Sequence, residues 1–144
     1  MQTKESAEVD HDKDFDSFMD RRLIAARAYV TGNPEPLGKI TARDSEATFF
    51  SPGGGYEKGT ENVSSVYTRD AKAFGKEGVT DFEIIQSGAG VDIGFWTGFQ
   101  TANVTLGGKE VSMKLRITEI FRRENGEWKM VHRHADPLAE KEEK

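Results

Sequence analysis

Two of the three histidines in the 144-residue sequence, His132 and His134, stand two residues apart near its C-terminal end. Side chains two residues apart in a β-strand point to the same face, so a strand here places both rings beside Trp128 and Met130. An imidazole among large apolar side chains must be hydrogen-bonded, bound to a ligand or used in proton transfer. The spacing therefore marks this face as the best candidate for a functional site.

A carboxylate is predicted to face these histidines. The dipeptide Asn125-Gly126 is typical of a two-residue hairpin turn, which fixes the register of its arms. In that register Glu119 pairs with His132, on a face that also carries Phe121 and that we expect the helices to cover. A carboxylate beside an imidazole can perform general acid–base catalysis. The alternative is a buried polar pair that satisfies its own hydrogen bonds and only fixes the register.

Metal and cofactor sites are alternatives that the same residues raise. His132, His134 and Glu119, joined by Asp136, have the residue types of a two-histidine, one-carboxylate metal site, but the metal-free interpretations are favoured and no metal is predicted. The glycine-rich segment 88–94 has the wrong spacing for a dinucleotide loop, and strand residues follow it where a helix must begin. No cofactor is therefore predicted.

Composition excludes several classes of function. The formal charge is −5, and the 20 Lys and Arg residues are scattered along the chain, so a nucleic-acid partner is not expected. There is no cysteine, which excludes disulfides and a thiol nucleophile. No run of roughly 18 apolar residues is present, so no membrane partner is expected. The default location is the cytoplasm, or the periplasm or exterior if a signal peptide was removed.

The pattern of apolar residues predicts a single domain over 14–137, between flexible tails at 1–13 and 138–144. Helical periodicity predicts a long helix over 14–31 and a shorter one after Asn33-Pro34. A short strand over 47–51 and a returning arm at 56–59 precede a third helix over 60–74. Four strands follow, at 80–87, 91–105, 111–124 and 127–136.

This order of elements predicts an α+β fold, in which three helices pack on one face of a curved antiparallel sheet. A pocket between the helices and the sheet would be lined by aromatic and apolar side chains, although residues at these spacings are also typical of an ordinary core. The candidate ligand-binding residues are His134, Tyr29, Trp96, Tyr67, Phe121 and Met130, and the candidate catalytic residues are Glu119 and His132.

Residues 118–134, which contain a Gly-x-Trp turn followed by Val-His-x-His, resemble the terminal hairpin of the nuclear transport factor 2-like superfamily. This superfamily includes SnoaL-like cyclases, ketosteroid isomerases and the association domain of calcium/calmodulin-dependent kinase II. The resemblance extends over 15–137, with weaker support from 47–52 and 59–63. It implies a cone-shaped, cystatin-like fold with a pocket between helices and sheet, and commonly a homodimer formed through the sheet.

The sequence departs from the isomerases at their catalytic positions. Their first strand supplies an aspartate directly before a proline, whereas Ser51 precedes Pro52 here, and a serine cannot act as that base. On a looser alignment Glu119 falls near the acid that donates to the oxyanion, and Tyr29 near their tyrosine. In the kinase association domain the position of Glu119 looks to be an arginine. The resemblance therefore implies the fold more strongly than any activity.

Two functional hypotheses follow. In the first, the domain binds a small apolar molecule with a polar group near Glu119 and His132, with or without isomerase-like or cyclase-like proton transfer. In the second, it is a non-catalytic association module. Ile120 and Val131 lie among long Arg and Lys side chains on the face opposite Glu119, which predicts self-association as a homodimer or larger ring.

Overall fold

The described part of the protein contains three helices and six strands. The structure is a computed structural model that describes residues 3–139, and the side chains of residues 13–139. The elements lie close to the predicted ranges, except that the first helix begins earlier. They are α1 (Thr3–Tyr29), α2 (Glu35–Ile40), β1 (Thr48–Phe50), β2 (Tyr56–Lys58), α3 (Thr60–Lys72), β3 (Val79–Ala89), β4 (Ile93–Leu106), β5 (Lys109–Glu124) and β6 (Glu127–Pro137).

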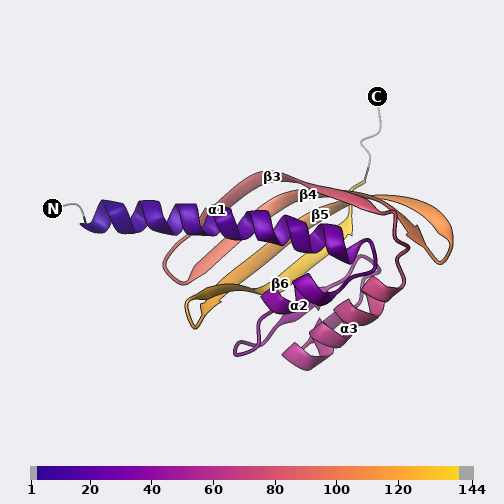
Figure 1. Ribbon diagram of the computed structural model, residues 1–144, viewed down its shortest axis with the longest axis horizontal. Helices are drawn as coiled ribbons and strands as arrows, with labels where there is room; N and C mark the ends of the chain where they lie inside the picture. Colours follow the sequence, from indigo (N-terminus) through magenta and orange to yellow (C-terminus); the bar gives the residue numbers. More distant parts are fainter. Residues whose placement is uncertain (1–2, 140–144) are drawn as a thin grey trace.

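Helix α1 packs along one face of the sheet, called here the inner face (Figure 1). Its apolar residues recur at helical spacing, and Phe15, Phe18 and Ala26 are buried against the sheet. Arg22 stands on the same stripe and is only 2 % exposed. The helix begins at Thr3, within the segment expected to be a flexible tail, and its first turns project beyond the sheet. Residues 1–2 and 140–144 of the two predicted tails lie outside the described residues.

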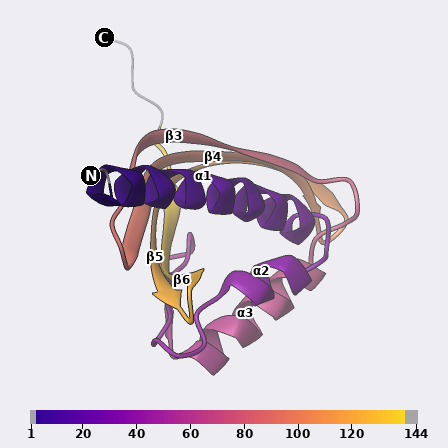
Figure 2. The ribbon, with the colours of Figure 1, turned by 60° about the vertical axis from the view of Figure 1, so that its left-hand side comes forward.

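The sheet has six strands in the order β2-β1-β6-β5-β4-β3. The four long strands pair antiparallel, as predicted, and curve around α1, while α2 and α3 lie beside α1 and contact β6, β1 and β2 (Figure 2). Strand β1, however, pairs parallel with β6, so the prediction of a wholly antiparallel sheet is wrong. These two strands are far apart in sequence, and no tight turn dictates their relative direction. The third helix follows the β1–β2 hairpin, in the predicted order of elements, so the three helices are not all grouped at the N-terminus.

The β5–β6 hairpin turns at Asn125-Gly126, where both residues have positive φ angles of 51° and 82°. Two positive φ angles define the type I′ turn that matches the twist of the strands. Near the turn the register is the predicted one, with Phe121 opposite Met130. The buried side chains of the hairpin, including Ile117, Phe121, Trp128 and Met130, face α1 as expected.

Beyond Met130 the register shifts by one residue. Ile120 pairs with His132 and Glu119 with Arg133, which leaves Val131 as the extra residue of a β-bulge. The prediction that Glu119 and His132 are cross-strand neighbours is therefore wrong. A one-residue insertion moves the following side chains to the opposite face. It turns Arg133 inward, and it turns both histidines to the side away from α1, called here the outer face.

Candidate functional site

A buried carboxylate lies at the centre of the inner face. The side chain of Glu119 is fully buried and accepts four hydrogen bonds. Its Oε1 accepts from Nε of Arg22 at 2.9 Å and from Nε1 of Trp96 at 2.8 Å. Its Oε2 accepts from Nη2 of Arg22 at 2.8 Å and from Nη1 of Arg133. We call these four residues the inner cluster.

Three neighbouring strands and one helix position the inner cluster. Trp96 on β4 pairs directly with Glu119 on β5, and Glu119 pairs directly with Arg133 on β6, so all three side chains point inward from one row across the sheet. Arg22 reaches this row from the apolar stripe of α1, where it makes a two-pronged contact with the carboxylate. The cluster therefore depends on the bulge, which alone brings Arg133 to this face.

Polar contacts continue from the inner cluster toward the edge of the sheet. Nη2 of Arg133 donates to Oε1 of Gln100 at 2.7 Å, and Nε2 of Gln100 donates to the hydroxyl of Thr80 at 2.9 Å. The Thr80 hydroxyl in turn donates to the carbonyl oxygen of Thr101 at 2.7 Å. The Gln100 amide thus accepts a hydrogen bond from Arg133 and donates one to Thr80, and these contacts fix the orientation of the Arg133 side chain.

Opposite charges determine the protonation of the inner cluster. Burial alone would raise the pKa of Glu119, but the guanidinium groups of Arg22 and Arg133 outweigh it and lower that pKa to about 2. Burial likewise opposes the charged form of Arg22, yet the Glu119 carboxylate raises the pKa of Arg22 overall. The three groups are therefore all ionised at neutral pH. Two positive charges and one negative charge leave a net charge of +1 in the cluster.

One donor of the inner cluster has no partner. Nη1 of Arg22 is the only buried side-chain nitrogen or oxygen among the described residues that makes no hydrogen bond. Its guanidinium carbon lies 5.3 Å from the centroid of the Phe82 ring, a cation–π contact that supplies no hydrogen-bond acceptor. An unsatisfied buried donor destabilises the folded state, so this nitrogen is a place where a bound acceptor would be favoured.

A cavity of about 270 Å³ adjoins the inner cluster, between α1, α3 and the sheet. Its polar lining includes Arg22, Arg133, Gln100, Tyr29 and Tyr67. Burial raises the pKa of both tyrosine hydroxyls, so they stay protonated and can donate hydrogen bonds. The remaining walls are mainly apolar and include Ala26, Leu37, Phe49, Phe74, Met113 and Leu115.

The predicted site residues divide into four groups. Tyr29 and Tyr67, two of the predicted ligand-binding residues, line the inner cavity. Trp96 and Glu119 lie in the inner cluster behind it. Phe121 and Met130 instead belong to the apolar core, where Phe121 packs edge-on against Phe15 and Phe18 with ring centroids 5.7 and 5.0 Å apart. His132 and His134 lie on the outer face.

Three polar residues of the site were missed by the sequence interpretation: Arg22, Arg133 and Gln100. Arg22 left a signal, because it is the charged residue between Phe18 and Ala26 on an otherwise apolar helical stripe. No sequence feature indicated that Arg133 points inward, because strict alternation of side chains from the turn assigns it to the outer face. Gln100 alternates with apolar strand residues but has no motif around it.

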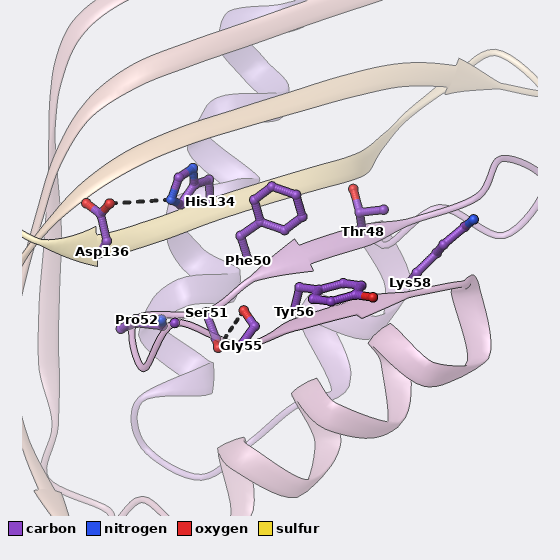
Figure 3. Close-up of a pocket in the computed structure, with 10 residues that line it drawn as sticks. Thr48, Phe50, Ser51, Pro52, Gly55, Tyr56, Lys58, His134 and Asp136 are labelled. Atoms are coloured by element: carbon purple, nitrogen blue, oxygen red, sulfur yellow. Dashed lines mark hydrogen bonds and ion pairs between the residues drawn. The ribbon is translucent and has the colours of Figure 1, made fainter.

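The outer face has a second hollow, a groove of about 550 Å³ shown in Figure 3. Phe50 and Tyr56 of the β1–β2 hairpin lie along it with Lys58, His134 and Asp136, and α1 lies behind the strands. Nε2 of His134 is 3.4 Å from Oδ2 of Asp136. The groove is open, since Phe50 is 41 % and Tyr56 70 % exposed.

His132 lies beside this groove and is held by β1. Its Nδ1 is 2.7 Å from the hydroxyl of Thr48, and its ring contacts Phe50 with centroids 4.9 Å apart. Burial, followed by the nearby His134, lowers the pKa of His132. The acid–base pair predicted from Glu119 and His132 does not form, because the sheet separates the two side chains.

Two further findings concern metals and membranes. Among the residues that the structure describes, no group of three or more histidine, aspartate or glutamate side chains is arranged to hold a metal ion. Glu119 in particular faces away from His132 and His134. The two-histidine, one-carboxylate metal site considered from the sequence therefore does not form. Over the same residues, no helix combines the length and the apolar character needed to cross a membrane.

Residues 23–140 match the family model of the SnoaL-like domain, and the chain belongs to this family. No curated protein matches the chain. The solved structures that resemble it share the nuclear transport factor 2-like, cystatin-like fold, which confirms the family resemblance inferred from the terminal hairpin.

Three of these structures illustrate the range. A proposed dehydratase of the nuclear transport factor 2-like family from Streptomyces avermitilis has a TM-score of 0.76 at 18% identity, covering 90% of this chain and 99% of that one. A proposed calcium/calmodulin-dependent protein kinase type II association domain from Thiobacillus denitrificans has a TM-score of 0.66 at 19% identity, covering 84% and 92%. An uncharacterised cystatin-like protein from Caulobacter vibrioides has a TM-score of 0.70 at 14% identity, covering 90% and 91%. At these identities the likeness establishes the fold alone.

Proposed function

We propose that the domain binds a small, largely apolar molecule in the inner cavity. The observation that carries this proposal is the composition of the cavity wall. Apolar side chains supply most of the surface, and a few polar groups converge at one side, among them Arg22 and Arg133. Small-molecule sites typically have this combination, in which the apolar wall provides affinity and the polar groups fix orientation.

Glu119 is assigned a positioning role in this site. Its two carboxylate oxygens already accept four hydrogen bonds, so no lone pair is free to take a proton from a ligand. A pKa of about 2 also makes it a poor base near neutral pH. Its function is to hold the Arg22 and Arg133 guanidinium groups against the cavity. The proposal is therefore binding, without proton transfer by Glu119.

The test is an NMR titration with 2-naphthol, an apolar molecule with one polar group. The indole N–H signals of Trp96 and Trp128 provide matched reporters, since Trp96 contacts Glu119 and Trp128 bonds to Asp14 elsewhere in the core. Saturable shifts of the Trp96 signal, with Trp128 unchanged, are expected. Their absence would contradict the proposal.

A variant at the cavity mouth provides the control. Ala73 lines the cavity and is also exposed to solvent, so a larger side chain there can obstruct entry without disturbing the core. Ala73→Trp should weaken 2-naphthol binding, whereas Lys72→Trp, whose side chain does not line the cavity, should leave it unchanged. Equal binding by the two variants would place the probe outside the cavity.

A second candidate function, self-association, is supported by the outer face. Phe50, Tyr56 and Ile93 are large apolar side chains exposed there by 41 %, 70 % and 53 %. Ile120, on which the sequence prediction depended, is half-buried on the same face, whereas Val131, the bulge residue, packs against the inner core. Exposed apolar area on a sheet face is typical of a protein–protein contact. We propose a homodimer or larger ring formed through this face, on the opposite side of the sheet from the cavity.

Sedimentation velocity at micromolar concentrations tests this association. Tyr56→Lys should dissociate the assembly, because it places a charge in the proposed contact without altering the core. Ile24→Lys is the matched control, since Ile24 is 59 % exposed on α1, away from the outer face. A monomer in the unsubstituted protein, or equal effects of the two substitutions, would contradict the proposal.

A further inference from the structure

We propose that the ligand of the inner cavity is a small apolar monoanion, with a carboxylate as its simplest charged group, bound by Arg22 and Arg133. This inference rests on the proposed function and makes it more specific. It names the charge of the ligand, the residues that recognise it and the nitrogen that would gain a partner.

The first argument is charge. Arg22 and Arg133 are nearly sealed from solvent, with side-chain exposures of 3 % and 12 %, and share a single carboxylate, that of Glu119. Buried charges are stable when paired, so the remaining positive charge favours an anion beside it. Asp70, the acidic residue on the cavity wall, is 38 % exposed and is bonded to Arg69, so it does not neutralise the inner cluster. One excess positive charge matches a monoanion.

The second argument is the unsatisfied donor. Arg22 uses Nε and Nη2 on Glu119, and Nη1 remains buried without a partner. Guanidinium groups bind carboxylates through short, charge-assisted hydrogen bonds, which are roughly twice as strong as neutral ones. Arg133 makes two hydrogen bonds among the described residues, and its guanidinium group carries further N–H donors. A ligand carboxylate held by these arginines would also supply the missing acceptor once the Arg22 side chain turns Nη1 toward the cavity.

The third argument is the remainder of the cavity. Tyr29 and Tyr67 line the cavity, and burial raises the pKa of both hydroxyls, so both are protonated donors. They can hold an acceptor but offer no negative charge to a cationic ligand. The cavity of about 270 Å³ admits a body of one or two rings, and its walls are mainly apolar. A second negative charge on the ligand would exceed the charge of the cluster.

The test compares 2-naphthoate with 2-naphthamide, which has the same apolar body and a neutral polar group. Binding is followed through the Trp96 indole N–H signal, with Trp128 as the reference. We expect 2-naphthoate to bind at least ~10-fold more tightly, because a charge-assisted contact exceeds a neutral one by about 1.4 kcal/mol, the equivalent of tenfold.

Variants assign the preference to the arginines. Arg22→Lys keeps a positive charge beside Glu119 but removes Nη1, and should reduce the preference for 2-naphthoate to about 2-fold or less. Arg133→Lys should also reduce the preference for 2-naphthoate, and it provides an independent measurement if Arg22→Lys does not fold. Arg116→Lys, on the outer face, should retain the full preference.

The outcomes distinguish this inference from the proposed function. If 2-naphthoate and 2-naphthamide shift the Trp96 signal with equal affinity, the cavity binds small molecules but the anion assignment is wrong. If neither compound nor 2-naphthol shifts that signal, both proposals fail together. If the preference for 2-naphthoate persists unchanged in both lysine variants, the anion is recognised elsewhere.

Discussion

Each face of the sheet carries a cluster of charged side chains. The two clusters have similar composition, but one is buried and the other is exposed to solvent. On the inner face, Glu119 is fully buried between two arginines and a tryptophan. On the outer face, Asp136 receives two hydrogen bonds from Arg116, at 2.6 and 2.8 Å, and lies near His134, but water reaches the whole group. Both clusters depend on β6, and neighbouring residues of that strand contribute to each.

The difference shows that burial, more than the geometry of the contact, decides how much an ion pair contributes to the stability of the fold. The contacts of Asp136 with Arg116 are as short as those within the inner cluster. When an exposed pair is broken, water solvates both groups, so such pairs contribute little to stability. When a buried pair is broken, a charge is left in an apolar region. Only the inner cluster is therefore expected to be essential to the fold.

The largest expected effect tests this contrast directly. Glu119→Ala removes the partner of two buried guanidinium groups and should lower the free energy of unfolding by about 3–5 kcal/mol. Asp136→Ala should lower it far less, because Arg116 is exposed and can be solvated. Chemical denaturation of both variants provides the measurement. Similar losses in the two proteins would refute the distinction between the clusters.

The second prediction concerns acid. Because the pKa of Glu119 is lowered in the folded protein from 4.5 to about 2, its ionised form stabilises the fold above pH 4.5. That contribution is lost as the pH falls from 4.5 toward 2, where the folded protein must take up a proton. Carbon-detected NMR of the Glu119 carboxyl should show no titration above about pH 3. A midpoint near 4.5 would mean that the arginines do not hold the carboxylate.

The sequence predicted the elements and half of the site. Helical and strand periodicity placed every helix and strand, and Asn125-Gly126 fixed the turn, so that Glu119 was correctly assigned to the inner face. These features are local, since each depends on a few consecutive residues and their backbone preferences. Counting from the turn assigns strand side chains to the correct face only as long as no bulge shifts the register of the two strands.

The partners of Glu119 were not predicted, because of a single inserted residue. The bulge at Val131 exchanges the faces of His132 and Arg133, and no glycine or proline beside Val131 indicates it in the sequence. Its cause is tertiary: in this register Arg133 reaches Glu119, and His132 reaches Thr48 of β1. Arg22 is different, since its place on the apolar stripe of α1 could have been read as a buried charge that needs a carboxylate.

The third prediction compares the two tryptophans. Both indoles are buried, at 0 % and 3 % exposure, and both donate to a carboxylate, Trp96 to Glu119 and Trp128 to Asp14. Substitution by Phe removes a similar volume in each case, so packing losses should be alike. The Asp14 side chain is 45 % exposed and can bond to water instead. Trp96→Phe should therefore be more destabilising than Trp128→Phe by about 1 kcal/mol, measured by denaturation.

The smallest expected effect concerns the outer face, where His132 serves as a reporter. Its pKa lies below the usual 6.5 because of burial and because protonated His134 repels a second positive charge. His134→Gln removes that repulsion, so the pKa of His132 should rise in an NMR titration of its ring protons. Gln100→Ala, at the inner cluster across the sheet, should leave the titration of His132 unchanged. A pKa of His132 that fell or stayed the same in His134→Gln would contradict the repulsion by His134, and an equal shift in Gln100→Ala would mean that the effect is not specific to the outer face.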